Sequence, residues 1–279
     1  MTNEEYTLPN DDMESLHTVM IDADEMQVYV GVSSVIGKRQ QQQDSVKADS
    51  DYAFAEEGRG IAVLCDGMGG LSGGEKASKL GVDTVYNAFH ELPAEASIPR
   101  FYAEWIDRAD TAVAALKSDD GKPLNAGSTM VSVVIEDGML YWASVGDSRI
   151  FIQRGEEIVC LTRDHNLLML LNAKVKRGEM TQEEADNDPK KEALISYIGV
   201  NGMRCVDISP QPIELENGDH VILCSDGLYR TVSIDEMLQI VRCFSGEATC
   251  AAEALTQLAL SKNYPHQDNT SVIVLEYRK

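Results

Sequence analysis

Short apolar runs in this sequence repeatedly end at, or begin beside, an aspartate that has small neighbours. Asp66 ends the run in VLCDGMGG, Asp147 follows WASVG, Asp226 follows VILCS, and Asp268 comes just before NTSVIV. A fifth acid, Asp44 in QQQQDSV, comes after the first apolar run. Short apolar runs bounded by Gly, Asn or Ser are typical of buried β-strands. Since strands of one sheet place equivalent ends together, we expect these distant acids to meet at one rim.

The first half of the chain is predicted to contain two strands and then two helices. Residues 27–37 alternate as a strand does, and GRGIAVLCDG (58–67) is typical of a short buried strand. Apolar residues then recur at helical spacing over 74–92 and over 98–118, and Pro99 lies near the start of the second helix.

The second half of the chain is richer in strands. Residues 128–162 predict two hairpins with Asp137-Gly138 and Arg154-Gly155 at their tips. Further along, NGDHVILCSDG predicts a turn and a buried strand, residues 247–260 predict a helix, and 269–279 predict a closing strand. Runs of strands with pairs of adjacent helices predict an α+β protein built in layers. We expect one domain over residues 27–279.

Residues 1–26 differ from the rest in composition. They carry acids at positions 4, 5, 11, 12, 14, 22, 24 and 25 but no Lys or Arg, so we predict a solvated, mobile leader. A regulatory or docking role for this leader stays open. The chain as a whole has a formal net charge of -22, which argues against nucleic-acid binding, since phosphate backbones recruit Lys and Arg.

The cellular compartment is predicted from the cysteines and from the absence of targeting signals. The six cysteines show no C-x-x-C spacing, and Cys65 and Cys224 lie inside apolar runs, as expected of buried free thiols in a reducing cytosol. The acidic start lacks the features of a signal peptide, and no apolar run reaches the ~20 residues of a membrane helix. We therefore predict a cytoplasmic protein.

Two interpretations of the strand-end acids compete. Taken singly, each aspartate is better explained as a turn or helix-cap residue. Taken as a set, carboxylates that converge resist joint ionisation, and hard divalent cations such as Mg²⁺ and Mn²⁺ relieve the repulsion. The repeated context therefore favours a metal site over a set of caps, although spacing alone leaves their convergence open.

The order of motifs resembles the catalytic domain of metal-dependent protein phosphatases of the 2C type, in their short bacterial serine/threonine form. The matching segments are GKRQQQQD (37–44), DGMGG (66–70), GSTMV (127–131), VGDSR (145–149), LTRDH (161–165), SDGL (225–228) and DNTSVIV (268–274). The resemblance implies an antiparallel β-sandwich flanked by helix pairs, in αββα layers, with a binuclear metal site at one edge. It also implies hydrolysis of phosphoserine and phosphothreonine by direct attack of a metal-activated water.

The resemblance assigns roles to individual residues. Asp66 would bridge two Mn²⁺ or Mg²⁺ ions, the Gly67 carbonyl would bind one of them, and Asp226 and Asp268 would complete the protein ligands. Asp44 would hold metal-bound water from the outer shell, and Asp147 with Asp226 would form a third, weaker metal position. Arg39 would clamp the phosphate through its planar guanidinium. Arg39, Asp44 and Asp66 are therefore the predicted catalytic residues.

Departures from the family pattern concern proton transfer and substrate choice. Met68 stands where animal members carry a histidine, and methionine cannot transfer a proton. His165 could replace that histidine, but we predict a structural role for it. Gln42-Gln43 precede Asp44, where an Asn-containing pair is usual. Residues 166–207 match the flap that borders the substrate surface, and they are predicted to tune substrate choice.

Partners follow from the resemblance as well. We expect phosphorylated proteins as substrates, Ser/Thr kinases among the partners, no nucleic acid or membrane, and a monomer. The alternative from another class is a catalytically silent binding module of the same fold, which loss of Asp66, Asp226 or Asp268 would have indicated. All of these acids are present.

Overall fold

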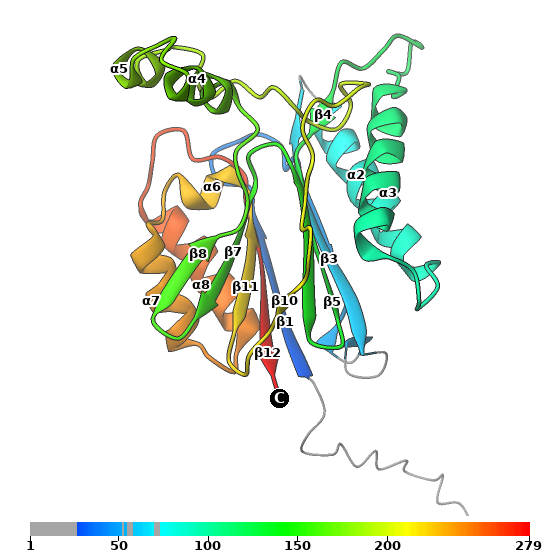
Figure 1. Ribbon diagram of the computed structural model, residues 1–279, viewed down its shortest axis with the longest axis vertical. Coiled ribbons are helices and arrows are strands. Elements are labelled where there is room, and N and C mark those ends of the chain that lie inside the picture. The colour runs from blue at the N-terminus through cyan, green and yellow to red at the C-terminus, as the bar shows by residue number, and fades with distance from the viewer. Residues whose placement is uncertain (1–26, 52, 55–57, 70–72) are drawn as a thin grey trace, which may run out of the picture.

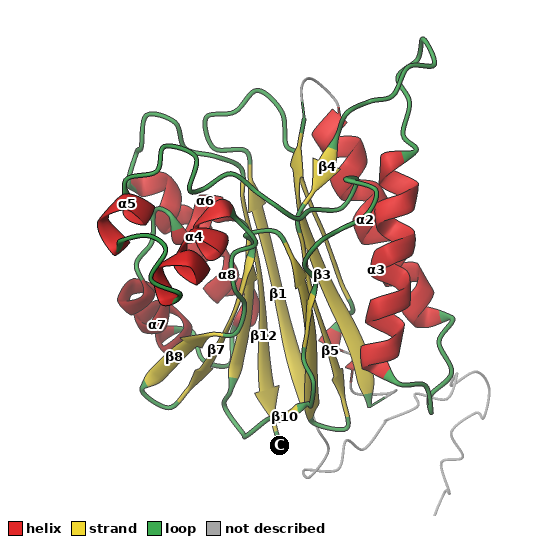
Figure 2. Ribbon diagram, turned by 45° about the horizontal axis from the view of Figure 1, so that its top comes forward, coloured by secondary structure: helices red, strands yellow, loops and turns green. Residues whose placement is uncertain are grey.

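Two antiparallel sheets stack face to face in the computed structural model, and helices cover the outer face of each (Figure 1). The structure describes residues 27–51, 53–54, 58–69 and 73–279, so the predicted leader over residues 1–26 lies outside the described part. The layers run helices, sheet, sheet, helices, which confirms the predicted αββα sandwich (Figure 2).

One sheet has five strands in the order β1-β12-β11-β7-β8. Its strands are β1 (Gln27–Val35), β12 (Thr270–Arg278), β11 (His220–Cys224), β7 (Arg149–Arg154) and β8 (Glu157–Cys160). The first and last strands of the described chain therefore pair along their full length, Gln27 opposite Arg278 and Val35 opposite Thr270.

The second sheet contains seven strands, and its main path is β10-β6-β5-β3-β2. These strands are β10 (Ile213–Glu214), β6 (Met139–Val145), β5 (Met130–Glu136), β3 (Arg59–Met68) and β2 (Asp44–Ala48), with β4 (Gly127–Ser128) on β3 and β9 (Asp207–Ile208) on β6. The β5–β6 turn is Asp137-Gly138, as predicted, and both residues have positive φ. In the β7–β8 hairpin Arg154 pairs with Glu157, so the tip is Gly155-Glu156, one residue later than predicted.

Strand alternation divides the core into three layers. On β3, Ala62 and Leu64 face the other sheet, whereas Ile61, Val63 and Cys65 pack against the helices. On β12, Ile273 and Leu275 lie between the sheets, whereas Val272 and Val274 pack against the helices that cover the five-stranded sheet. Successive side chains of a strand point to opposite faces, so a central strand of a covered sheet must be apolar on both.

Two pairs of helices form the outer layers. α2 (Gly73–His90) and α3 (Ile98–Ala114) cover the seven-stranded sheet, and α7 (Ile234–Cys243) and α8 (Ala248–Ser261) cover the other. α2, α3 and α8 agree with the predicted helices within a few residues. α7 was not predicted, although Ser233 and Glu236 form a capping box at its start.

The predicted flap carries two further helices, α4 (Leu167–Lys176) and α5 (Gln182–Asp186), which lie beyond one end of the sandwich (Figure 1). No helix among the described residues is long and apolar enough to cross a membrane. Of the cysteines, all free, Cys65 and Cys224 are buried as predicted, whereas Cys243 and Cys250 are exposed.

Candidate metal centre

The pairing of β2 with β3 brings the first two predicted acids together. Asp44 is the first residue of β2, and the antiparallel register sets it directly opposite Asp66 on β3. The backbone at Asp66 is held by Thr129, whose Oγ1 accepts from Asp66 N at 3.0 Å and whose own amide donates to Asp66 O at 2.9 Å. The position of Asp66 therefore depends on strand pairing rather than on a flexible turn.

The next two acids come from the other sheet. Asp226 follows β11 as the first residue of α6 (Asp226–Tyr229), and Asp268 lies two residues before β12. Ser225 connects the sheets, because its Oγ donates to Asp44 Oδ2 at 2.8 Å and accepts from Ser271 N at 3.0 Å. The acids therefore meet at one rim, but strand ends of both sheets supply it, where the edges of the sandwich face each other.

Asp147 joins the rim through a strained turn after β6. Gly146 has φ +97°, and a Cβ there would lie 2.7 Å from Thr129 Cγ2, so this position requires glycine. His165 braces the turn: its Nδ1 accepts from Gly146 N at 3.2 Å and its own amide donates to Gly146 O at 2.9 Å. His165 is fully buried, with Nε2 3.3 Å from Asp207 Oδ2, which is the structural role predicted for it.

A polar cavity of about 340 Å³ opens among these residues. Its lining consists of Arg39, Gln43, Asp66, Gly67, Met68, Gly69, Thr129, Asp147, Leu194, Asp226, Asp268 and Asn269. Asp44 is buried behind Asp66 and is not part of the lining. Of the seven predicted site residues, the structure therefore places six at one cavity and the seventh next to it.

The negative charges of the acids repel one another. Burial raises the pKa of Asp66 well above its usual value, and the negative charges of Asp44, Asp226, Asp147 and Asp268 raise it further. Burial, again the largest cause, raises the pKa of Asp226 to about 7 and that of Asp44 to about 6. The ionised cluster is therefore costly unless a cation neutralises it.

The oxygen atoms of the rim fit a hard divalent cation. Asp44 Oδ1 and Asp226 Oδ1 are buried and have no hydrogen-bond partner, although buried polar atoms nearly always have one. Mg²⁺ and Mn²⁺ prefer such carboxylate oxygens and keep several waters, which suits an open cavity. Among the residues that the structure describes, no three Asp, Glu, His or Cys side chains are grouped as they would be around a single metal ion.

Glycine at position 67 is explained by close packing beside the cavity. A Cβ at Gly67 would lie 2.1 Å from Gly74 O and 2.6 Å from Gln43 O. The nearest obstacle is the start of α2, which packs against the end of β3, so this packing by itself requires glycine at position 67.

Two arginines reach the carboxylates, and only one of them was predicted. Arg39 Nη2 lies 2.5 Å from Asp268 Oδ2, so the expected phosphate clamp contacts a predicted metal ligand. Arg230, the residue that sequence reasoning missed, places Nε 3.0 Å from Asp226 Oδ2. Its spacing of four residues from Asp226 is the signal that would have found it.

Two amide side chains, which sequence reasoning also missed as site residues, hold the Arg39 loop against the rim. Asn269 Oδ1 accepts from Gln43 N at 2.8 Å, and its Nδ2 donates to Ile36 O at 2.9 Å and Gln41 O at 3.1 Å. Gln43 Nε2 donates to Gly69 O at 3.2 Å. The Asp-Asn pair before the last strand was the signal, since Asn often ties loop backbone in place.

Comparison with known proteins places this arrangement in a family. Residues 33–259 match the family described as protein phosphatase 2C. The chain is 30% identical over 242 residues to protein phosphatase PhpP of Streptococcus pneumoniae, covering 85% of this chain and 92% of that protein.

Solved structures give the same result. A serine/threonine phosphatase of S. agalactiae superposes with a TM-score of 0.75 at 29% identity, covering 89% of this chain and 98% of that one. The catalytic domain of the serine/threonine protein phosphatase PstP, in complex with two manganese ions, superposes with a TM-score of 0.71 at 26% identity. That match covers 91% of this chain and 100% of the PstP domain.

Proposed function

The chain belongs to the protein phosphatase 2C family and is a metal-dependent serine/threonine protein phosphatase, and on this premise we propose which of its residues bind the metal and the phosphate. One observation carries the assignment. Acids from both sheets share one cavity, and Asp226 in its lining and Asp44 next to it each keep a buried carboxylate oxygen without a partner.

Two Mn²⁺ or Mg²⁺ ions are proposed for this cavity. Asp66, Asp226 and Asp268 would bind them together with the Gly67 carbonyl, and Asp44 would act from behind by hydrogen bonding to their water. Once bound, a pair of such ions lowers the pKa of a water molecule and neutralises charge on the phosphoryl group. The PstP domain, which superposes on this chain, is described as a complex with two manganese ions, and this supports the number.

The chain's own residues orient the phosphate and limit where protons can reside. Arg39 is 58% exposed at the cavity, so it can exchange the carboxylate of Asp268 for two phosphate oxygens. Met68 lines the cavity and cannot transfer a proton, and the His165 ring is fully buried. We therefore assign no side chain as the general acid for the leaving alkoxide, and we propose that water supplies that proton.

Substrates, partners and location are proposed more broadly. Phosphoproteins, including Ser/Thr kinases, would present a phosphoserine or phosphothreonine to the open cavity, with the flap beside it. The buried free thiols Cys65 and Cys224 support a reducing compartment such as the cytoplasm. We propose that the chain acts as a monomer.

The test uses a phosphothreonine peptide with the purified full chain, first with Mn²⁺ and then with EDTA. The Asp226→Asn variant removes one proposed metal ligand while keeping the side chain's shape. We expect phosphate release with Mn²⁺, none with EDTA, and a loss of about a thousandfold in Asp226→Asn, equivalent to ~4 kcal/mol. Asp107→Asn, the same substitution on an exposed residue of α3, serves as the matched control.

The outcomes distinguish the alternatives. Turnover that survives both EDTA and Asp226→Asn would contradict the metal mechanism. Absence of turnover by the wild type under every metal condition would instead indicate the catalytically silent binding module.

A further inference from the structure

Arg230 stands among three carboxylates, and each of its guanidinium nitrogens faces a different one. Nε lies 3.0 Å from Asp226 Oδ2, Nη2 lies 3.5 Å from Asp147 Oδ2, and Nη1 lies 3.1 Å from Glu192 Oε2. Asp147 and Asp226 belong to the rim, whereas Glu192 belongs to the flap. A planar guanidinium suits such a position because its donors are fixed in a fork.

The direction of Arg230 is set by the short helix that precedes it. α6 makes one turn from Asp226, and Arg230 N donates to Asp226 O at 3.1 Å. Tyr229 is held by Arg149, whose guanidinium lies 3.7 Å from the Tyr229 ring centroid. Arg149 is held in turn by two hydrogen bonds to Asp164, at 2.8 and 3.0 Å. These contacts fix the end of α6 and so aim Arg230 at the rim.

The two oxygens of Asp226 face different surroundings. Oδ2 pairs with Arg230, whereas Oδ1 is buried with no hydrogen-bond partner. Oδ1 is therefore available to the proposed metal pair while Oδ2 is already neutralised. A third metal ion between Asp147 and Asp226 would lie next to the Arg230 guanidinium and meet its positive charge at close range. The residues present do not fit a third ion there.

Glu192 connects Arg230 to the part of the flap that borders the cavity. Its segment is bound to the start of α4, since Leu168 N donates to Lys191 O at 2.8 Å and Leu167 N donates to Ala193 O at 2.9 Å. Leu194, two residues after Glu192, lines the polar cavity at the rim. The ion pair from Arg230 to Glu192 therefore holds the cavity wall on the flap side.

We propose that the Arg230 guanidinium is the third cation of this rim: it replaces a metal ion between Asp147 and Asp226 and ties the flap to the rim through Glu192. This inference rests on the proposed two-metal function. It is an alternative to the expected third, weaker metal position, and it makes Arg230 a positioning residue that sets both metal number and flap mobility.

The first test counts metal ions. The full chain is dialysed against saturating Mn²⁺, and bound manganese is measured by mass spectrometry for the wild type, Arg230→Ala and the control Arg242→Ala. Arg242 is a partly exposed residue of α7 that pairs with Glu156, away from the rim. We expect two ions in the wild type and the control. We expect a third in Arg230→Ala, because removal of the guanidinium leaves three unneutralised carboxylates.

The second test measures the flap in metal-free protein by the rate of trypsin cleavage after Lys190, an exposed residue two positions before Glu192. Arg230→Ala and Glu192→Gln should each raise this rate about two- to fivefold, the range that a partly exposed ion pair supports. Glu192→Gln should still bind two ions, because Arg230 remains on the rim. This variant keeps the proposal testable if Arg230→Ala fails to fold.

Contrary results are separable from failure of the phosphatase function. Three ions in an active wild type, or two in a folded Arg230→Ala, would overturn the role of Arg230 as a cation. Cleavage of Glu192→Gln at the wild-type rate would overturn its role as a flap tether. A wild type that binds no Mn²⁺ and releases no phosphate would contradict the proposed function itself.

Discussion

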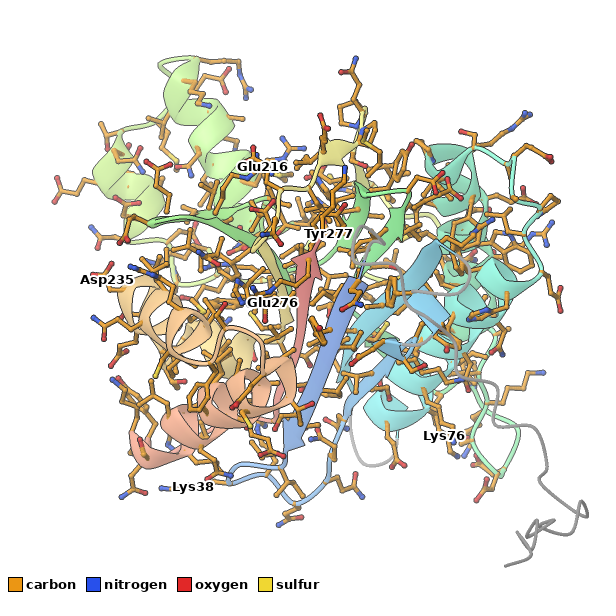
Figure 3. All side chains as sticks on the ribbon, turned by 90° about the horizontal axis from the view of Figure 1, so that it is seen from below. Lys38, Lys76, Glu216, Asp235, Glu276 and Tyr277 are labelled. Carbon is orange, nitrogen blue, oxygen red and sulfur yellow. The ribbon has the colours of Figure 1, made fainter. Side chains whose placement is uncertain are left out.

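Buried carboxylates occur at both ends of the sandwich, and Glu276 at one end has more hydrogen-bond donors around it than Asp44 or Asp226 at the other. Glu276, near the end of β12, is fully buried and accepts from Gly246 N at 2.6 Å, Ser245 Oγ at 3.0 Å and Arg278 Nε at 2.7 Å (Figure 3). Burial acts to raise its pKa, but His220, the Gly246 amide and the Ser245 hydroxyl lower the pKa to about 2. The Glu276 carboxylate is therefore satisfied without a ligand.

The rim at the other end has the opposite balance. There burial and mutual repulsion raise the pKa values of Asp44, Asp66 and Asp226, and Asp44 and Asp226 each keep an oxygen without a partner. The comparison shows that burial of an acid does not by itself mark a functional site. What marks it is a shortage of internal hydrogen-bond donors and positive charge, which bound metal ions would offset.

The largest expected effect is a loss of catalysis without a loss of fold. Asp66→Asn should reduce phosphate release with Mn²⁺ by about a thousandfold or more, because it removes the acid proposed to bridge both ions. In metal-free protein near neutral pH the same change should raise the free energy of unfolding by about 1–2 kcal/mol, because it removes a repelled charge. Peptide assays and urea unfolding check both. If Asp66→Asn instead lowers the free energy of unfolding of the metal-free protein, the acids at the rim do not repel one another, and the two ends of the sandwich do not differ in this way.

Glu276→Gln should have the reverse effect. It leaves Arg278 and His220 without the carboxylate that they surround, and we expect it to lower the free energy of unfolding by about 3 kcal/mol with turnover per folded molecule unchanged. Glu216→Gln is the control, since Glu216 pairs with Arg154 while 66% exposed and should change stability by less than about 1 kcal/mol. If both substitutions change the free energy of unfolding by the same amount, burial of the Glu276 carboxylate does not contribute to stability.

The two ends also predict opposite pH dependence. The pKa of Glu276 is about 2 when folded against 4.5 as the ordinary value, so its contribution is present above about pH 4.5 and is lost toward pH 2. The pKa of Asp44 is raised from 3.8 to about 6, so the metal-free folded state loses stability as pH rises between these values.

Urea unfolding across this pH range, with EDTA or with Mn²⁺, measures both effects. The free energy of unfolding of the wild type exceeds that of Glu276→Gln, and we expect this difference to shrink below about pH 4.5. Without metal, we expect the free energy of unfolding of Asp44→Asn to exceed that of the wild type by an amount that grows from about pH 4 to about pH 6. If Mn²⁺ leaves the second difference unchanged, the rim does not need a cation.

The smallest effect is expected at a rim residue that carries no charge. Met68→Leu keeps an apolar side chain of similar volume, and we expect kcat on a phosphothreonine peptide to change by less than about twofold. A tenfold loss would show that the thioether contacts the substrate or its leaving group, and it would require a reassignment of this position.

Much of the fold could be predicted because local pattern reports local structure. Period-two alternation located β1, short apolar runs located β3, β11 and β12, and helical spacing located α2, α3 and α8. α7 was missed because the capping box that marks its start was not recognised. The β7–β8 tip shifted by one residue because cross-strand pairing, rather than the Gly residue alone, decides which residues turn.

The sequence by itself determined which acids lie at or beside strand ends, because a charge inside a buried apolar strand is costly unless it has partners. Tertiary structure alone decided that those ends belong to two facing sheets, that Ser225 links them, and that Gly67 is required by α2. It also decided that Arg230 reaches Asp147 and Glu192, which lie far from it along the chain. Such contacts depend on how the sheets stack, and no local period encodes that distance.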